Sequence, residues 1–249
     1  MKNIEFSELA IYYDDVMKKF VPYSDQIEFL SEIVKKNNLH DSNILDVGCG
    51  TGLVAHYLNR KGYRVSGLDN SDEMLNIAIE KSKKLGIDIK YYKGDIREYK
   101  SNQKYEMVYS INQVINHILD NNDVISFFKR VDDLLNDDGI FVFDFISYSE
   151  KIVGVTNVNA INENFEYDEI KNISYDFTTQ LLSEEQVYYI REDDSIKKYV
   201  NDENKRCFGM EEIRLYLEVL TGFKILSIYN SWEFIKDSSD YFFIVVAKK

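Results

Sequence analysis

The stretch NILDVGCGTGLVAHYLNRKGYRVSGLDN, residues 43–70, decides the fold of this chain of 249 residues. An apolar run that contains Asp46 leads into three glycines at alternate positions, Gly48, Gly50 and Gly52. A helical pattern follows, and a second apolar run then ends in Asp69. This order of strand, glycine turn, helix, strand and acid is typical of units that hold a nucleoside across the carboxyl ends of parallel strands.

The spacing of the glycines narrows the choice of ligand. Dinucleotide sites favour G-x-G-x-x-G, in which a pyrophosphate rests on a helix N-terminus. Here Leu53 follows G-x-G-x-G, so an NAD-dependent oxidoreductase is disfavoured. Asp46 suits a ligand with an ammonium or sulfonium group, and its alternative role is polar support of the glycine loop. Asp69 ends an apolar strand, where a carboxylate can accept both hydroxyls of a ribose.

The run DVGCGTG at 46–52 resembles motif I of the class I S-adenosylmethionine-dependent methyltransferases. Further segments match that family in order: Asp69 as the ribose-binding acid, NSDEML at 70–75 and GDI at 94–96. The resemblance covers residues 40–147 closely and the last forty weakly. It implies that Met74 lies against the adenine and that Asp95 reaches the adenine amino group, although Asp95 has an alternative role in capping the next turn.

The same resemblance implies S-adenosylmethionine as the cofactor. The residues expected to bind it are Asp46, Gly48, Cys49, Gly50, Gly52, Asp69, Asn70, Met74, Gly94, Asp95, Ile96, Ser110 and Ile111.

Composition limits the class of protein. The net charge of −13, from 30 basic and 43 acidic residues, argues against a nucleic acid partner. The single proline, Pro22, rules out the N-P-P-aromatic motif of methyltransferases that act on amino groups of nucleic acid bases. No apolar run approaches the ~20 residues of a membrane span, and the N-terminus is no secretory signal. We therefore expect a cytoplasmic protein with no membrane partner and with Cys49 and Cys207 reduced.

Hydrophobic periodicity predicts an α/β fold with a seven-stranded, mostly parallel sheet and helices on both faces. Strands are expected at 43–47, 64–69, 88–93, 105–111 and 139–146. Helices are expected at 5–19, 22–38, 52–61, 71–85 and 121–136. Gly86 and Gly139 stand where helix C-caps belong. A later helix at 208–223, ending at Gly222, precedes strands at 223–230 and 241–247.

Residues 147–207 break this alternation. Aromatic and β-branched runs predict a small antiparallel meander with strands at 164–170, 172–182, 185–192 and 195–201 and a turn at Asp193-Asp194. The expected organisation is thus a methyltransferase core at 1–146 and 208–249, with helices 5–38 as a lid, and an inserted β unit at 147–207. The insertion is expected to be a substrate cover or a dimer surface, and the chain a monomer or a homodimer.

The chemistry requires a nucleophile aligned in its unprotonated form. NQVINHI, residues 112–118, follows the fourth strand, and its Asn116 and His117 are the candidate acceptor contacts, with His117 as a base. The alternative for His117 is a packed or capping role. Tyr13, in a Tyr13-Asp14 pair of the first helix, is a third candidate, or else one aromatic of that helix's apolar face. Tyr148 and Trp232 could also line the pocket.

No metal is expected, because His40, His56 and His117 do not cluster with carboxylates at ligand spacing. The leading hypothesis is methyl transfer to a nitrogen or oxygen of a small molecule, such as an amino sugar, a nucleotide-linked sugar, an amine or a secondary metabolite. A non-catalytic S-adenosylmethionine-binding regulatory module is the alternative, and an RNA methyltransferase is disfavoured by charge.

Overall fold

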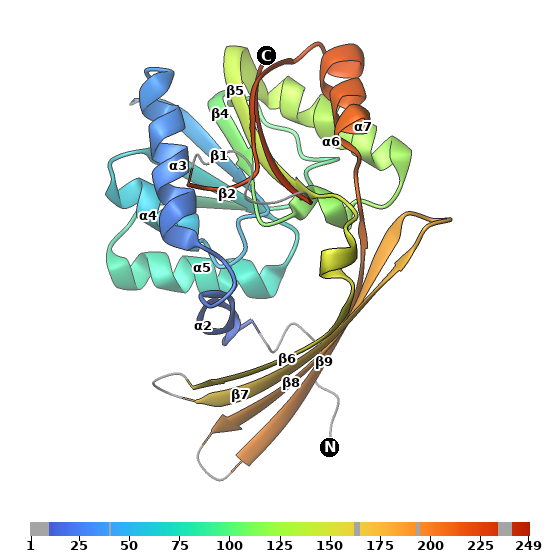
Figure 1. Ribbon diagram of the computed structural model, residues 1–249. Coiled ribbons are helices and arrows are strands. Elements are labelled where there is room, and N and C mark those ends of the chain that lie inside the picture. Colours follow the sequence, from blue (N-terminus) through green and yellow to red (C-terminus); the bar gives the residue numbers. More distant parts are fainter. Residues whose placement is uncertain (1–9, 40, 162–164, 193–194, 234–240) are drawn as a thin grey trace.

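The computed structural model describes residues 10–39, 41–161, 165–192, 195–233 and 241–249. Its centre is a seven-stranded sheet in the order β10-β11-β5-β4-β1-β2-β3 (Figure 1). The strands are β1 (Asn43–Val47), β2 (Arg64–Asp69), β3 (Lys90–Lys93), β4 (Tyr105–Ser110), β5 (Leu135–Ile146), β10 (Lys224–Tyr229) and β11 (Phe242–Lys248). Strand β11 runs antiparallel to both β5 and β10. The predicted mostly parallel sheet is confirmed.

Helices cover both faces of this sheet. They are α3 (Tyr23–Lys36), α4 (Leu53–Arg60), α5 (Asp72–Leu85), α6 (Asn121–Leu134) and α7 (Met210–Arg214), which continues as the π-helix η3 (Leu215–Thr221). One buried apolar cluster joins the sheet to α6, α7 and η3, and a second joins it to α3 and α4. In the first cluster the rings of Phe141 and Phe143 stack with centroids 4.7 Å apart.

Caps explain where helix α5 starts and stops. The Ser71 hydroxyl accepts from Met74 N at the start of α5, and Gly86, with φ 65°, ends that helix as predicted. The prediction for Gly139 is wrong. Helix α6 ends at Leu134 and the chain enters β5 directly, through an irregular stretch in which Asp138 has φ 66°. A Cβ at Gly139 would lie 2.8 Å from Asn136 O, so the glycine serves close packing within that stretch.

The first expected helix is shorter than its periodicity suggests. Only α2 (Tyr13–Met17) is helical, and residues 5–9 lie outside the described residues. Val16 and Tyr12 face the insertion, where they join a buried cluster with aromatic residues of that unit.

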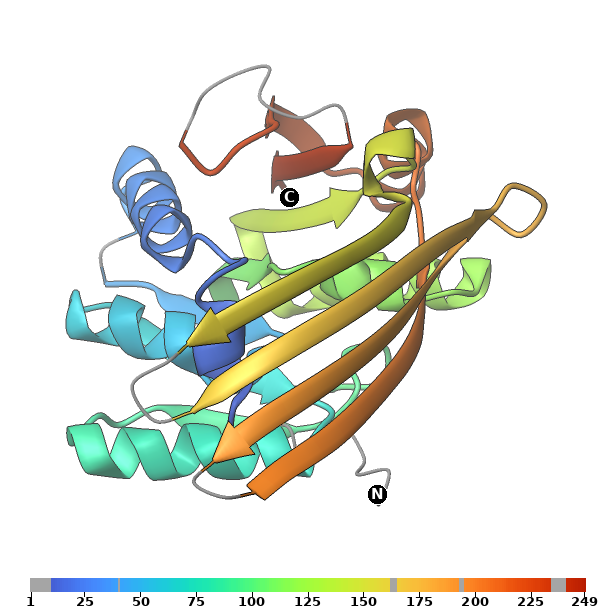
Figure 2. The same ribbon diagram turned by 60° about the horizontal axis from the view of Figure 1, so that its bottom comes forward.

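The insertion is a four-stranded antiparallel sheet in the order β6-β7-β8-β9. Its strands are β6 (Gly154–Ile161), β7 (Glu166–Asp176), β8 (Leu181–Glu192) and β9 (Ser195–Arg206), preceded by the 3-10 turn η2 (Glu150–Ile152). Figure 2 shows these long strands lying across the core.

Two details of the predicted meander are wrong. Strand β6 was not predicted, because its asparagine-rich sequence carries little strand signal. The expected strands 164–170 and 172–182 are instead one strand, β7, followed by a turn. Asp176 makes that turn: its carboxylate accepts from Thr178 N at 2.7 Å and from the Thr179 hydroxyl at 2.9 Å. The expected Asp193-Asp194 turn lies outside the described residues.

Within the described part of the chain, no helix is both long enough and apolar enough to span a membrane.

Candidate functional site

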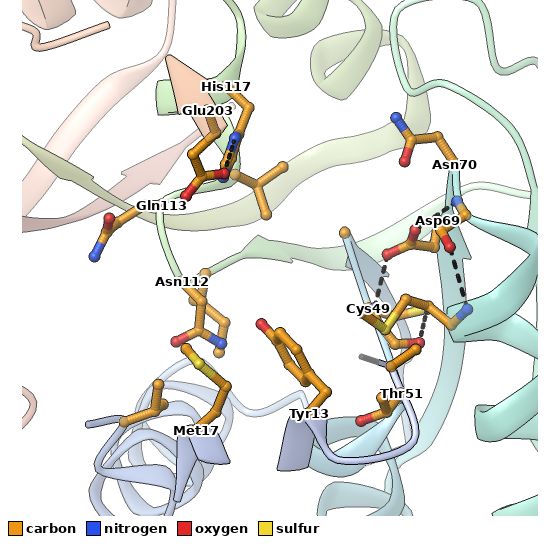
Figure 3. A pocket seen from close by; sticks show the side chains of 18 of the residues that line it. Tyr13, Met17, Cys49, Thr51, Asp69, Asn70, Asn112, Gln113, His117 and Glu203 are labelled. Atoms are coloured by element: carbon orange, nitrogen blue, oxygen red, sulfur yellow. Dashed lines mark hydrogen bonds and ion pairs between the residues drawn. The ribbon is translucent and has the colours of Figure 1, made fainter. Parts of the chain in front are cut away.

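A cavity of about 700 Å³ lies at the carboxyl ends of the central strands. The glycine loop and the ends of β2 and β4 form one side, helix α2 closes another, and the inner face of the β6–β9 sheet forms the floor. Figure 3 shows that Tyr13 extends from α2 into this space, with Cys49 and Asn112 on either side of it in that view. The volume falls in the range of about 300–1,000 Å³ that is usual for ligand pockets.

The glycine loop is shaped by contacts that exclude side chains. Gly48, Gly50 and Gly52 have φ of 75°, 53° and 74°, a conformation that favours glycine. A Cβ at Gly48 would lie 2.4 Å from a methyl of Val114, and one at Gly52 would lie 2.6 Å from the Tyr91 hydroxyl. At Gly50 nothing lies within 4 Å of the added carbon, so this residue leaves the backbone open for a ligand.

Asp69 is fixed from two directions. One carboxylate oxygen accepts from Gly50 N at 2.7 Å and the other from Ser71 N at 2.8 Å. An ionised carboxylate can accept about four hydrogen bonds, so capacity remains for a ribose. Asp69 lines the cavity together with Asn70 and Met74.

Asp46 lies in the cavity wall and is only 3% exposed. Burial raises the pKa of its carboxyl to about 8. A buried acid of this kind is stabilised in its charged form by a cation brought beside it, so the ammonium of an amino acid moiety fits here. Burial also raises the pKa of the neighbouring Cys49 thiol, which keeps that side chain a neutral part of the wall.

Asp95 also lines the cavity, but its carboxylate is engaged locally. Oδ1 accepts from Arg97 N and from Arg97 Nε, each at 2.9 Å, and these bonds hold the pKa of Asp95 below its usual value. Arg97 reaches on to Asp123. The local capping role of Asp95 is therefore present, and its contact with adenine stays a prediction. Gly94 and Ile96 line the cavity beside it.

Three expected site residues, Gly52, Ser110 and Asn116, are not among the described residues that line the cavity. The Ser110 hydroxyl donates to Val47 O at 3.1 Å and joins the ends of β4 and β1, while its neighbour Ile111 lines the cavity. Asn116 is fully buried. Its Nδ2 donates to Ile146 O at 3.0 Å and to Arg206 O at 2.6 Å, and its Oδ1 accepts from Ile146 N. The expected acceptor contact of Asn116 is corrected to a structural role, because the 3-10 turn η1 (Val114–His117) directs this side chain inward.

His117, the last residue of η1, does line the cavity. Its Nδ1 lies 3.6 Å from Glu203 Oε2 of strand β9, and 47% of its side-chain surface is accessible (Figure 3). Burial lowers the pKa of the imidazole more than the nearby Glu203 raises it. The ring is therefore neutral, and able to take a proton, at a lower pH than an ordinary histidine.

Helix α2 is tied to the glycine loop through Asp14. The carboxylate of Asp14 accepts from the Thr51 hydroxyl and from Lys81 Nζ of helix α5. Tyr13 lines the cavity, where burial and the nearby acids Asp14, Asp69 and Glu203 raise the pKa of its hydroxyl to about 12. Tyr13 is thus a neutral hydroxyl that α2 holds over the site.

Sequence reasoning missed the floor of the cavity. Alternate residues of three strands face it: Glu169, Lys171, Glu184, Gln186, Tyr188, Asn201, Glu203 and Lys205. Lys205 Nζ lies 3.2 Å from Glu184 Oε2 and 2.9 Å from Glu203 Oε1. The sequence carried little signal for this face, because 184–186 and 201–205 are polar at every position and no alternation distinguishes the two faces of these strands.

Apolar clusters flank this polar floor at both ends. One contains Phe165, Tyr167 and Tyr199, and the other contains Leu182 and Cys207. Tyr148 and Trp232 are not among the described residues that line the cavity: Tyr148 packs on Tyr175, and Trp232 packs on Phe29.

Among the described residues, no three or more histidine, cysteine, aspartate or glutamate side chains are grouped so that they could hold a metal ion.

Comparisons with known proteins agree with this geometry. Residues 44–139 match a family model described as a methyltransferase domain. A methyltransferase homologue of Geobacillus sp. (strain WCH70) is 28% identical over 254 residues, which covers 98% of this chain and 99% of the relative. A carboxy-S-adenosyl-L-methionine synthase of a Nitratiruptor species is 32% identical over 159 residues, which covers 61% of this chain and 62% of the relative.

Solved structures share the fold over nearly the whole length. An S-adenosylmethionine-dependent methyltransferase from Clostridium acetobutylicum ATCC 824 superposes with a TM-score of 0.83 at 25% identity, covering 98% of both chains. CalS10, an amino pentose methyltransferase from Micromonospora echinaspora solved with S-adenosylmethionine bound, has a TM-score of 0.78 at 16% identity, covering 96% of both chains.

The fold and the glycine-loop cavity define an α/β protein with a nucleoside-type site at the carboxyl ends of its strands. Together with these relatives they identify the chain as a class I S-adenosylmethionine-dependent methyltransferase, with S-adenosylmethionine as its methyl donor.

Proposed function

We propose that this methyltransferase acts on an amine nitrogen of a small polar molecule, bound between the glycine loop and the floor formed by β7, β8 and β9. The charge of the cavity wall supports this proposal. Among the described residues that line it, seven are acidic, namely Asp46, Asp69, Glu73, Asp95, Glu169, Glu184 and Glu203, and three are cationic, namely Arg97, Lys171 and Lys205. Burial favours the protonated form of Asp46 until a cation lies beside it, and the other six acids still outnumber the cations. Such a wall favours a cationic or neutral acceptor over one that carries a phosphate or carboxylate there.

The floor gives the acceptor polar partners of both signs. Lys205 is already paired with Glu184 and Glu203, and these two carboxylates keep its pKa raised although burial opposes this. Burial acts to raise the pKa of Glu203, but Lys205 and His117 hold it below its usual value, so Glu203 remains ionised. An ionised carboxylate beside His117 is a suitable partner for an ammonium group that arrives with the acceptor.

The cavity residues and the donor share the chemistry between them. Bound S-adenosylmethionine supplies a methyl group on a sulfonium, and the acceptor nitrogen forms the new N–C bond as the S–C bond breaks and its electron pair stays on sulfur. An ammonium acceptor must first lose a proton, and His117 takes it. Glu203 stabilises the imidazolium so formed, and the Tyr13 hydroxyl orients the reacting groups. The products are S-adenosylhomocysteine, the methylated ammonium and the proton taken up by His117.

The names of two structural neighbours fit an amine acceptor on a sugar. CalS10 is described as an amino pentose methyltransferase, and KedS8 from Streptoalloteichus sp. ATCC 53650, with a TM-score of 0.78 at 14% identity, as a sugar N-methyltransferase. An amino sugar would match the floor, because its hydroxyls can bond Gln186 and Asn201 while its amine meets Glu203. In this proposal the β6–β9 sheet is the acceptor cover, and the protein works on small molecules without nucleic acid.

Matched acceptor pairs test the proposal. The protein is incubated with methyl-labelled S-adenosylmethionine and with amino sugars or their hydroxyl counterparts, and the labelled products are analysed by mass spectrometry. The proposal predicts label on nitrogen of the amines and none on the counterparts. Label on oxygen, or label on added RNA, would overturn the acceptor class. Tight binding of S-adenosylhomocysteine with no transfer to any acceptor would instead support the regulatory module.

A further inference from the structure

Two successive residues in the cavity wall adopt a conformation that L side chains rarely take. Asn112 has φ 65° and Gln113 has φ 67°, and both lie in the left-handed region directly after β4. Asparagine tolerates this region better than most residues, but glutamine has no such advantage. Strained pairs of this kind persist only where surrounding groups hold them.

Asp144 of strand β5 supplies that hold. Its Oδ2 accepts from Asn112 N at 2.8 Å and its Oδ1 accepts from Gln113 N at 2.6 Å, so each oxygen takes one backbone donor. The side chain is 1% exposed and lies where β5 pairs with β11, in the middle of the sheet. From the other side, Gln26 Nε2 of helix α3 donates to Asn112 Oδ1 at 2.7 Å.

The left-handed turn at Asn112–Gln113 determines where η1 lies. Helix η1 starts at the next residue, and the tight approach of Val114 to Gly48 places this element against the glycine loop. At the other end of η1, Asn116 anchors inward while His117 faces the cavity. A rotation of the turn into an extended conformation would therefore shift both Val114 and His117.

We infer that Asp144 is a positioning residue for methyl transfer: its carboxylate locks the Asn112–Gln113 turn in the left-handed conformation, and the turn fixes η1 and His117 against the glycine loop. The catalytic half of this inference rests on the proposed function, in which His117 accepts a proton. The structural half, that Asp144 holds the turn, does not.

A pair of variants at Gln113 separates backbone conformation from side-chain chemistry. Both Gln113→Gly and Gln113→Val remove the amide, but glycine favours the left-handed region and a β-branched valine opposes it. We expect amide hydrogen exchange over residues 111–118 to be at least about tenfold faster in Gln113→Val than in Gln113→Gly, and turnover to be lower in the valine variant by a similar factor. Equal exchange and equal turnover in the two variants would overturn the inference.

Asp144→Asn tests the anchor itself. An amide can accept only one of the two N–H groups and turns its own NH2 toward the other. Exchange over 111–118 should rise while exchange in β1 and β2 stays unchanged, and kcat should fall at least about tenfold with the acceptor KM changed much less. If the variant is less stable but keeps wild-type exchange over residues 111–118 and wild-type kcat, the inference is overturned and the role of Asp144 is purely structural.

The two readouts fail independently. Exchange over residues 111–118 needs no acceptor, so it decides whether Asp144 holds the turn even if no amine is ever methylated. If Asp144→Asn does not fold, the comparison of Gln113→Gly with Gln113→Val still decides whether the left-handed turn positions η1 and His117.

Discussion

Asp46, buried in the wall of the site, has its pKa raised to about 8, and burial is the main cause. A carboxyl whose pKa is higher in the folded than in the unfolded chain keeps its proton on folding. Between the unfolded value of about 3.9 and the folded value, the folded state therefore binds more protons, and stability falls as pH rises. The ligand-free protein thus disfavours the ionised form of Asp46, and a cationic group of the bound donor would stabilise that form.

Asp46→Asn should remove part of this pH dependence. Urea unfolding of the ligand-free protein at pH 6 and pH 8 should show a loss of stability in the wild type that is smaller in the variant, because an amide has no proton to retain. S-adenosylhomocysteine should bind the variant more weakly. A variant that loses as much stability as the wild type between these pH values would contradict the assignment.

His117→Ala should lower turnover by at least about tenfold, since general base catalysis commonly contributes a factor of ~100 or more. Because the pKa of His117 is lowered, the wild-type rate should fall with decreasing pH only below the ordinary histidine range, and the variant should lack this acidic limb. Affinity for S-adenosylhomocysteine, measured by calorimetry, should change little. Equal turnover in the variant would remove His117 from the mechanism.

Residue identity alone could not predict which of His117 and Asn116 faces the cavity. The two are adjacent, and both are plausible acceptor contacts by residue type, but a 3-10 turn sends one side chain into the core and the other into the cavity. The donor residues were easier to predict, because glycines at alternate positions and an acid ending a strand are constraints within one short segment. Gly48, Gly50, Gly52 and Asp69 are all predictable in this way, although only Gly48, Gly50 and Asp69 line the cavity.

Helix α2 is connected to helices α4 and α5 through a single carboxylate. Asp14 reaches the start of α4 through Thr51 and helix α5 through Lys81, while Tyr12 and Val16 pack on the β6–β9 sheet. The helix therefore joins the donor side of the cavity to its floor. These partners are distant in sequence, so periodicity predicted a helix here but not what it holds together.

Asp14→Asn should weaken this connection. Hydrogen bonds to charged groups contribute about 1.5–3 kcal/mol, so we expect affinity for S-adenosylhomocysteine to drop about tenfold or more as α2 loosens. Asp15→Asn is the matched control. Among the described residues, the ion pair identified for Asp15 is with Lys18, and it lies at the surface. Equal affinities in the two variants would show that Asp14 does not hold α2 against the donor side of the cavity.

At the scale of the whole molecule, the core was predictable and the floor was not. Alternating helical and strand periodicity predicted the seven strands to within a few residues, since each burial pattern is local. The inner face of the β6–β9 sheet depends on register across three strands and on how that sheet crosses the core, which one sequence does not encode in any short segment. The charged side chains that we propose to bind the acceptor are therefore the least predictable part of the site.

The comparison of Glu203→Gln with Glu185→Gln tests the central claim most directly. Both changes remove one carboxylate from the insertion, but Glu203 lines the cavity beside His117 while Glu185 is exposed and does not line it. Turnover with an amine acceptor, measured in both variants alongside S-adenosylhomocysteine affinity, should fall at least about tenfold in Glu203→Gln and stay at the wild-type level in Glu185→Gln, with donor affinity unchanged in both. Equal turnover in the two variants would contradict an acceptor site on the floor of this sheet.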